Sequence, residues 1–83
     1  KHSVQLTKWW IFLIFPNPAT TFLYIDTNIH FKSYNYTIFT IDGKEILNGK
    51  LTENKKIDIQ SLIPGIYFIK INNNSNSKRF IKI

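Results

Sequence analysis

The stretch from Ile57 to Ile71 constrains the fold of this chain more than any other. Its first residues alternate between apolar and polar side chains, which is the period-2 pattern of a strand with one buried face. The pattern L-x-P-G-x-Y follows, with Leu62 before the tight-turn dipeptide Pro64-Gly65 and Tyr67 just inside the next strand. This spacing predicts a tyrosine corner, in which the ring is buried at a core edge and the hydroxyl binds main chain a few residues upstream. The alternative is an ordinary Pro-Gly connection beside a buried aromatic residue.

Strand patterns recur along the chain at intervals of about 8–12 residues, which is typical of an all-β sandwich. The seven predicted strands are 9–15, 21–26, 36–41, 44–50, 56–60, 65–71 and 78–83. Two of the connections carry strong signals. Pro16-Asn17-Pro18 prevents both helix formation and ladder pairing, and Asp42-Gly43 favours a hairpin. No segment shows a 3.6-residue period, so the sequence predicts seven antiparallel strands in a β-sandwich.

The last predicted strand carries one apolar set and one basic set of side chains. Its alternation places Ile81 and Ile83 toward the core and Lys78, Phe80 and Lys82 toward solvent. An exposed aromatic residue between two lysines on an edge strand is compatible with a docking stripe, acting through its side chains or by strand addition. It is equally compatible with protection of the edge, for which lysine is well suited. Both interpretations remain open at this point.

The size of the chain and its residue types exclude several classes of site. With 83 residues it forms one domain and buries only about 60–65% of its unfolded surface, so its core needs large side chains. The absence of cysteine excludes disulfides, thiolate metal sites and a thiol nucleophile. The two histidines have no companion at metal-ligand spacing, and the five acidic residues form no catalytic pair. We therefore expect no catalytic residue, no metal, no cofactor and no enzymatic activity.

Charge and hydropathy limit the partners of the chain. The net charge is +6, but the basic residues are spread along the whole sequence, which favours a lysine-rich solvated surface over a nucleic-acid site. The longest apolar run, Trp9–Phe15, is far shorter than the ~20 residues of a membrane-spanning helix. Because both faces of this predicted strand are apolar, self-association through Trp9–Phe15 is a hypothesis.

Four separate stretches resemble one family, the C-terminal sorting domains of type IX secretion. Phe15–Ala19 is similar to the family's Y-P-N-P-A opening, and Ile38–Ile46 to its central I-Y-D-x-x-G-K-x-V. Ile57–Tyr67 is similar to its I-D-I-S-x-L-x-x-G-x-Y, and Lys78–Ile83 resembles its lysine-bearing final strand. The blocks occur in order and at suitable separations from Ile14 to Ile83.

Two positions and one stretch depart from the family pattern. Thr40 stands where the family usually has aspartate, with Asp42 two places later, which puts a role for that acid in doubt. Gln60 replaces the usual serine, and Trp9–Leu13 is more apolar than the family's first strand.

The resemblance implies an immunoglobulin-like antiparallel sandwich that acts as a secretion signal. Residues 1–10 would be a linker to an upstream cargo domain, and residues 11–83 the sorting domain. Its partners would be outer-membrane components of the type IX translocon and a sortase-like cysteine protease that removes the signal. The route would lead through the periplasm to the cell surface or the extracellular space, where the cargo is released or anchored.

The resemblance also implies a set of signal residues. These residues are Pro16, Asn17, Pro18, Gly43, Lys44, Leu62, Gly65, Tyr67, Lys78, Phe80 and Lys82. From the spread of the basic residues we expect no nucleic-acid partner. The rival interpretation is an accessory immunoglobulin-like or fibronectin-like module that binds carbohydrate or mediates adhesion, for which exposed coplanar aromatic rings would be the expected feature.

Overall fold

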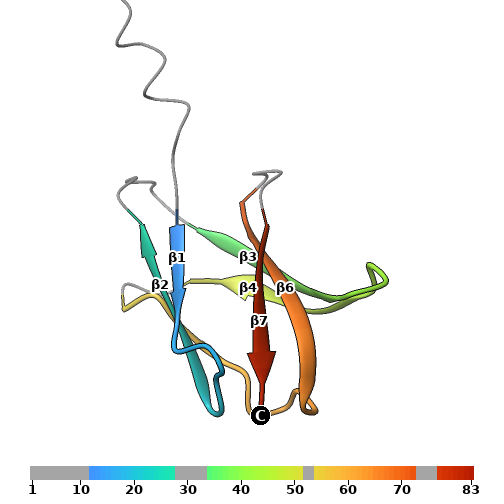
Figure 1. Ribbon diagram of the computed structural model, residues 1–83. Helices are drawn as coiled ribbons and strands as arrows, with labels where there is room; N and C mark the ends of the chain where they lie inside the picture. Colours follow the sequence, from blue (N-terminus) through green and yellow to red (C-terminus); the bar gives the residue numbers. More distant parts are fainter. Residues whose placement is uncertain (1–11, 28–33, 52–53, 73–76) are drawn as a thin grey trace, which may run out of the picture.

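The structure, a computed structural model, describes residues 12–27, 34–51, 54–72 and 77–83. Within these ranges all regular structure is β-strand, which confirms the predicted all-β fold, and no helix there could span a membrane (Figure 1). The strands are β1 (Phe12–Phe15), β2 (Phe22–Thr27), β3 (Asn35–Thr40), β4 (Glu45–Lys50), β5 (Lys56–Asp58), β6 (Gly65–Ile71) and β7 (Ser77–Lys82). The predicted linker 1–10 and the predicted strand residues 9–11 lie outside the described residues.

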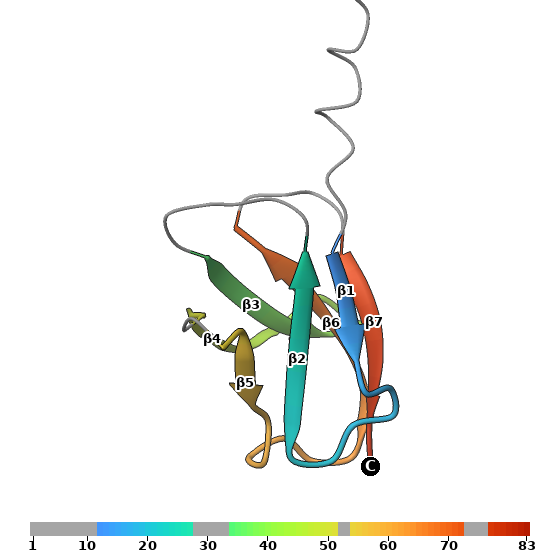
Figure 2. The ribbon, with the colours of Figure 1, turned by 90° about the vertical axis from the view of Figure 1, so that its left-hand side faces the viewer.

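The seven strands form two antiparallel sheets. One sheet has the order β1-β2-β5 and the other the order β4-β3-β6-β7. Figure 2 shows the smaller sheet lying in front of the larger one, with β1 beside β7 where the edges of the two sheets meet. The N-terminal end of the described chain therefore belongs to the three-stranded sheet.

The inward faces of both sheets supply one core. Leu23 and Ile25 of β2 face inward, as their alternation predicts, and Ile69 and Ile71 of β6 join the same buried cluster from the other layer. Burying one such side chain stabilises the fold by about 1.5–3 kcal/mol. The core consists of Phe12, Ala19, Leu23, Ile25, Tyr34, Ile38, Ile57, Ile59, Leu62, Tyr67, Ile69, Ile71 and Phe80.

The connection between β3 and β4 is the predicted hairpin. The Gly43 N–H donates to the Thr40 carbonyl at 2.9 Å, and the Thr40 N–H donates to the Lys44 carbonyl at 2.9 Å. Gly43 has a φ of 90°, a left-handed conformation that glycine adopts without steric cost. The Thr40 hydroxyl donates to the Asp42 carboxylate and accepts from the Lys44 N–H. The pKa of Asp42 is lowered mainly by the hydrogen bond from the Thr40 hydroxyl. A hydrogen bond from the Asp42 main chain and the nearby Lys44 charge lower it further.

The orientation predicted for the last strand is wrong. Phe80 is fully buried and Lys82 is only 8% exposed, whereas Ile83 is 59% exposed. The reason is the register between β6 and β7: Phe80 lies opposite Tyr67, whose ring faces the core, so every second residue of β7 faces inward with it. Lys78, Phe80 and Lys82 therefore point toward the core, and they do not form an exposed docking stripe.

The described part of the apolar run 9–15 has one buried and one exposed face. Phe12 is buried, while Leu13 is 56% exposed and Phe15 packs on Tyr24 of β2 with ring centroids 5.6 Å apart. The hypothesis of self-association through Trp9–Phe15 remains a prediction, since Trp9–Ile11 lie outside the described residues.

Candidate recognition site

The segment that leaves β1 at Pro16–Pro18 lies on the outer edge of β7. Proline has no N–H, so the side chain of Asn17 makes the pairing that a strand would make with its main chain. The Asn17 amide oxygen accepts from the Ile81 N–H at 3.0 Å, and its amide nitrogen donates to the Arg79 carbonyl at 3.3 Å. Asn17 therefore joins the end of one sheet to the edge of the other.

Ala19 continues this attachment with its main chain. Its N–H donates to the Ile81 carbonyl at 2.8 Å, and its carbonyl accepts from the Ile83 N–H at 2.9 Å. The side chain of Ala19 is fully buried, which leaves no room for a larger residue without displacement. Together Asn17 and Ala19 occupy the β7 edge from Arg79 to Ile83, so a partner strand cannot add there without displacing them.

The connection between β5 and β6 is the predicted tyrosine corner. The Tyr67 hydroxyl donates to the Ile63 carbonyl at 2.5 Å, and its ring is buried. Leu62 is also buried, and its N–H donates to the Ile59 carbonyl at 3.1 Å. The nearest side-chain atom to a β-carbon added at Gly65 would be Cε2 of the Tyr67 ring, at 3.9 Å. The corner is thus confirmed, and it fixes the inward face of β6.

Two lysines of β7 pack their apolar stems against neighbouring side chains and place their ammonium groups near the two ends of the strand. Lys78 places its Nζ 5.9 Å from the centre of the Phe12 ring of β1, a cation–π contact across the junction of the sheets. Lys82 is buried, and its Nζ donates to the main-chain oxygen of Ile83 at 3.2 Å.

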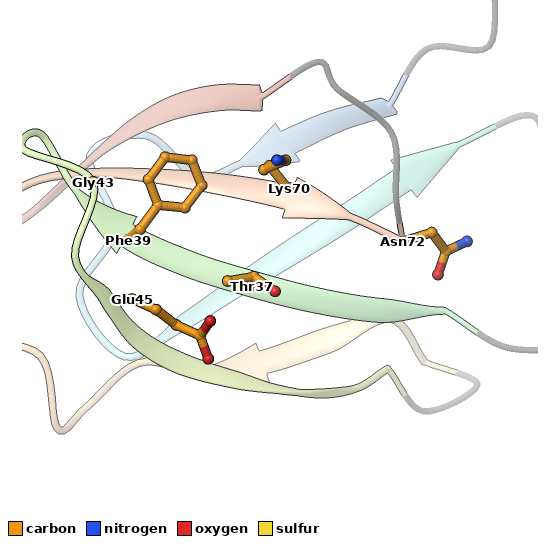
Figure 3. Close-up of a pocket in the computed structure, with 6 residues that line it drawn as sticks. All are labelled: Thr37, Phe39, Gly43, Glu45, Lys70 and Asn72. Carbon is orange, nitrogen blue, oxygen red and sulfur yellow. The ribbon is translucent and has the colours of Figure 1, made fainter.

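A groove of about 400 Å³ opens on the outer face of the four-stranded sheet. Thr37 of β3 is short, and longer side chains from β4, β3 and β6 rise around it (Figure 3). The groove has an aromatic ring at one end and a carboxylate and an ammonium group on its sides. It is lined by Thr37, Phe39, Gly43, Glu45, Lys70 and Asn72. Sequence analysis missed this feature, because its members meet only through the pairing of distant strands.

Comparison with known families decides what this domain is. The family model of the secretion system C-terminal sorting domain matches residues 13–83, nearly the whole chain. The chain belongs to this family. Comparison with curated proteins gives no significant match. The domain is the C-terminal sorting signal of type IX secretion, which confirms the resemblance that its motifs predict. Such a signal implies an upstream cargo, the secretion machinery, and export through the outer membrane to the surface or beyond.

The sorting domain brings most of its predicted signal residues together at one end of the two-sheet fold. Lys82 lies opposite Gly65 and bridges to Ala19, and Phe80 lies opposite Tyr67. Asn17, Gly65, Tyr67, Phe80 and Lys82 are joined by these pairs and hydrogen bonds, and Pro16, Pro18 and Leu62 lie close to them in the chain. Gly43 and Lys44 lie instead on the β3–β4 hairpin, and Lys78 lies toward the other end of β7.

The amide of Asn17 is expected to hold the edge of the sorting domain. Asn17→Ala removes two exposed hydrogen bonds and should lower the free energy of unfolding by about 1–2 kcal/mol. The matched control is Asn48→Ala, which removes a local bond to Glu45 and should cost under about 0.5 kcal/mol. Urea unfolding measures both. Hydrogen exchange gives the sharper test, because the Ile81 amide should lose protection in Asn17→Ala only; unchanged protection there would contradict the role of Asn17.

The hydroxyl of Tyr67 is expected to contribute measurably to the corner. Tyr67→Phe keeps the ring but leaves the Ile63 carbonyl without this donor, so the free energy of unfolding should fall by about 1–1.5 kcal/mol. Tyr24→Phe is the control, because Tyr24 stacks on Phe15 at the outer face of the smaller sheet. Equal stabilities of the two variants in urea would argue against the corner bond.

Proposed function

We propose that residues 11–83 direct a cargo joined through residues 1–10 across the outer membrane by way of the type IX translocon. The cargo would pass through the periplasm, and a sortase-like cysteine protease would then cut near the linker, leaving the cargo released or anchored at the surface. In this proposal the domain is a substrate of the machinery, with no catalytic residue, cofactor or nucleic-acid partner of its own. The observation that carries the proposal is the family match over residues 13–83.

The signal is proposed to be the folded domain. Its predicted signal residues are far apart in the sequence, and several of them are buried in the core or bonded across the edge, as Tyr67 and Asn17 are. Buried side chains cannot be read directly by a partner; they hold a surface in shape. We further propose that the two packed sheets and the tyrosine corner form an immunoglobulin-like sandwich.

A reporter fusion tests this function. A periplasmic reporter joined to residues 1–83 should appear outside a type IX-competent bacterium and stay inside an isogenic strain without the translocon. Mass spectrometry of the exported reporter should find the new C-terminus within or next to residues 1–10. Retention of the folded fusion inside the competent strain would overturn the export proposal, and export of the uncut fusion would overturn the processing step alone.

A further inference from the structure

The outer face of the four-stranded sheet carries an apolar and aromatic patch that the core does not use. Phe39 of β3 lies opposite Phe68 of β6, with ring centroids 5.9 Å apart and planes at 18°, and Phe68 lies opposite Arg79 of β7. In the next row, Ile66 lies opposite Ile81. The strand register thus builds a continuous surface across three strands, with an arginine at its margin.

This surface is open to solvent in part, with Phe39, Phe68 and Ile81 half-buried. Ile66 is 43% exposed, and Ile83, on the same side of β7 as Ile81, is 59% exposed. Ile41 in the adjoining hairpin is 74% exposed. Monomeric soluble proteins seldom expose contiguous large apolar side chains without a function, and an aromatic pair beside an arginine is the composition of interface hot spots. We call Phe39, Ile66, Phe68, Ile81 and Ile83, with Arg79, the docking face.

The charges around the docking face indicate the chemistry of its partner. Arg79 borders the patch, and Lys70 borders the groove beside Phe39. Glu45, the acidic residue of that groove, already accepts a hydrogen bond from Asn48. Glu45 keeps its negative charge in this hydrogen bond, but Arg79 and Lys70 together outnumber it. The margin is therefore net cationic, and it complements a surface with carboxylates around an apolar centre.

The docking face lies on the sheet that does not contain the first described strand. The chain reaches the fold through β1, which belongs to the three-stranded sheet. On the outer face of that sheet the Lys56 ammonium lies 4.3 Å from the centre of the Phe22 ring, so a cation covers that ring, while Leu13 and Phe15 stay exposed beside β2. β1 meets β7 at the junction of the two sheets, and the outer face of the larger sheet lies outside that junction, where a partner can reach it.

We propose that the sorting domain docks on the translocon through this face, and that its partner is a folded protein surface with an apolar centre and an acidic rim. This inference rests on the proposed function. The docking face lies on the outward side of β7. The stripe of Lys78, Phe80 and Lys82 that the alternation predicted lies on the opposite, inward side of that strand.

Export of reporter fusions tests the docking face. Ile66→Thr/Arg79→Glu removes an exposed apolar contact and reverses the charge at the margin, and should lower export about tenfold or more. The matched control, Leu13→Thr/Lys56→Glu, makes the same changes on the outer face of the other sheet and should keep export within about twofold of the unaltered fusion. Threonine preserves strand propensity, and melting of each purified domain reports the fold. Should the double variant melt early, Arg79→Glu alone carries the test, because that side chain is exposed.

The outcomes separate the docking face from the function it serves. Normal export of the unaltered fusion together with normal export of Ile66→Thr/Arg79→Glu overturns the docking face and leaves the sorting function standing. Failure of the unaltered fusion overturns the proposed function and the inference with it.

A binding assay distinguishes the partner class. The purified domain should bind detergent-solubilised translocon, more weakly as salt rises, and should not bind vesicles of phosphatidylglycerol and phosphatidylcholine. Vesicle binding that depends on Ile66 and Arg79, without translocon binding, would identify a membrane surface and overturn the protein partner.

Discussion

Phe80→Ala is expected to lower the free energy of unfolding by about 3–5 kcal/mol, the largest loss from any single substitution considered for this domain. The ring is fully buried and stacks on Tyr67 with centroids 5.7 Å apart. A domain of 83 residues has a total stability of only about 4–12 kcal/mol. The loss removes a large part of that stability, so the variant should populate unfolded states at 37 °C more than the unaltered domain does, and a fusion that carries it should be exported less.

Ile83→Ala is the matched control for Phe80→Ala. Ile83 carries the alternate apolar face of the same terminal segment and is mostly exposed, so its truncation should cost less than about 0.5 kcal/mol. Urea unfolding followed by circular dichroism measures both variants. A costly Ile83→Ala beside a tolerated Phe80→Ala would mean that β7 faces the other way and that the register with β6 is wrong.

The tyrosine corner and the hairpin could be predicted because short-range chemistry determines them. The Pro64-Gly65 turn and Tyr67 lie within four residues, and the corner bond reaches Ile63, also within four. Gly43 supplies the left-handed conformation that its hairpin needs. In both places the local sequence leaves the backbone few alternatives, so the sequence alone determines the structure.

Which side chains of β7 face the core could not be predicted, because the alternation of this strand is ambiguous. The segment K-R-F-I-K-I has apolar residues on both faces, and two isoleucines on one face outnumber one phenylalanine on the other. The decision comes from β6: the corner holds Tyr67 toward the core, and pairing places Phe80 opposite it. A one-residue slip exchanges the two faces of a strand, and the run of similar turn residues before β7 does not indicate in the sequence at which residue the turn lies.

The attachment of Asn17 and the groove beside Phe39 could not be predicted from the sequence for a related reason. Asn17 binds residues more than 60 positions away, and Thr37, Glu45 and Lys70 meet only across β4, β3 and β6. Each depends on the order of strands in a sheet, which alternation does not encode. The sequence does indicate a special role for Asn17. It lies between two prolines, which have no N–H group, and its side-chain amide can make hydrogen bonds in their place.

Lys82→Glu should cost about 3 kcal/mol, because it places a carboxylate at a buried position beside an oxygen. The native ammonium donates to the main-chain oxygen of Ile83 at 3.2 Å, whereas a carboxylate there can donate nothing and is repelled. Burial would raise the pKa of the introduced acid in the folded state above its unfolded value. The part of the deficit that comes from ionisation should therefore vanish at pH below about 4, where the acid is neutral in both states, grow as pH rises from there to the folded pKa, and level off above it.

Lys82→Met separates the charge of Lys82 from its packing. Methionine matches the buried stem, so stability should stay within about 1.5 kcal/mol of the unaltered domain, measured by urea unfolding across pH 4–8. If Lys82 acts only by packing, the Lys82→Met fusion should be exported normally, whereas Lys82→Glu should fail wherever it unfolds. A folded Lys82→Met domain that is not exported would show instead that the machinery reads the ammonium at the end of β7. Because the Lys82 ammonium lies next to Ile83 of the docking face, such a result would extend that face to the end of the strand.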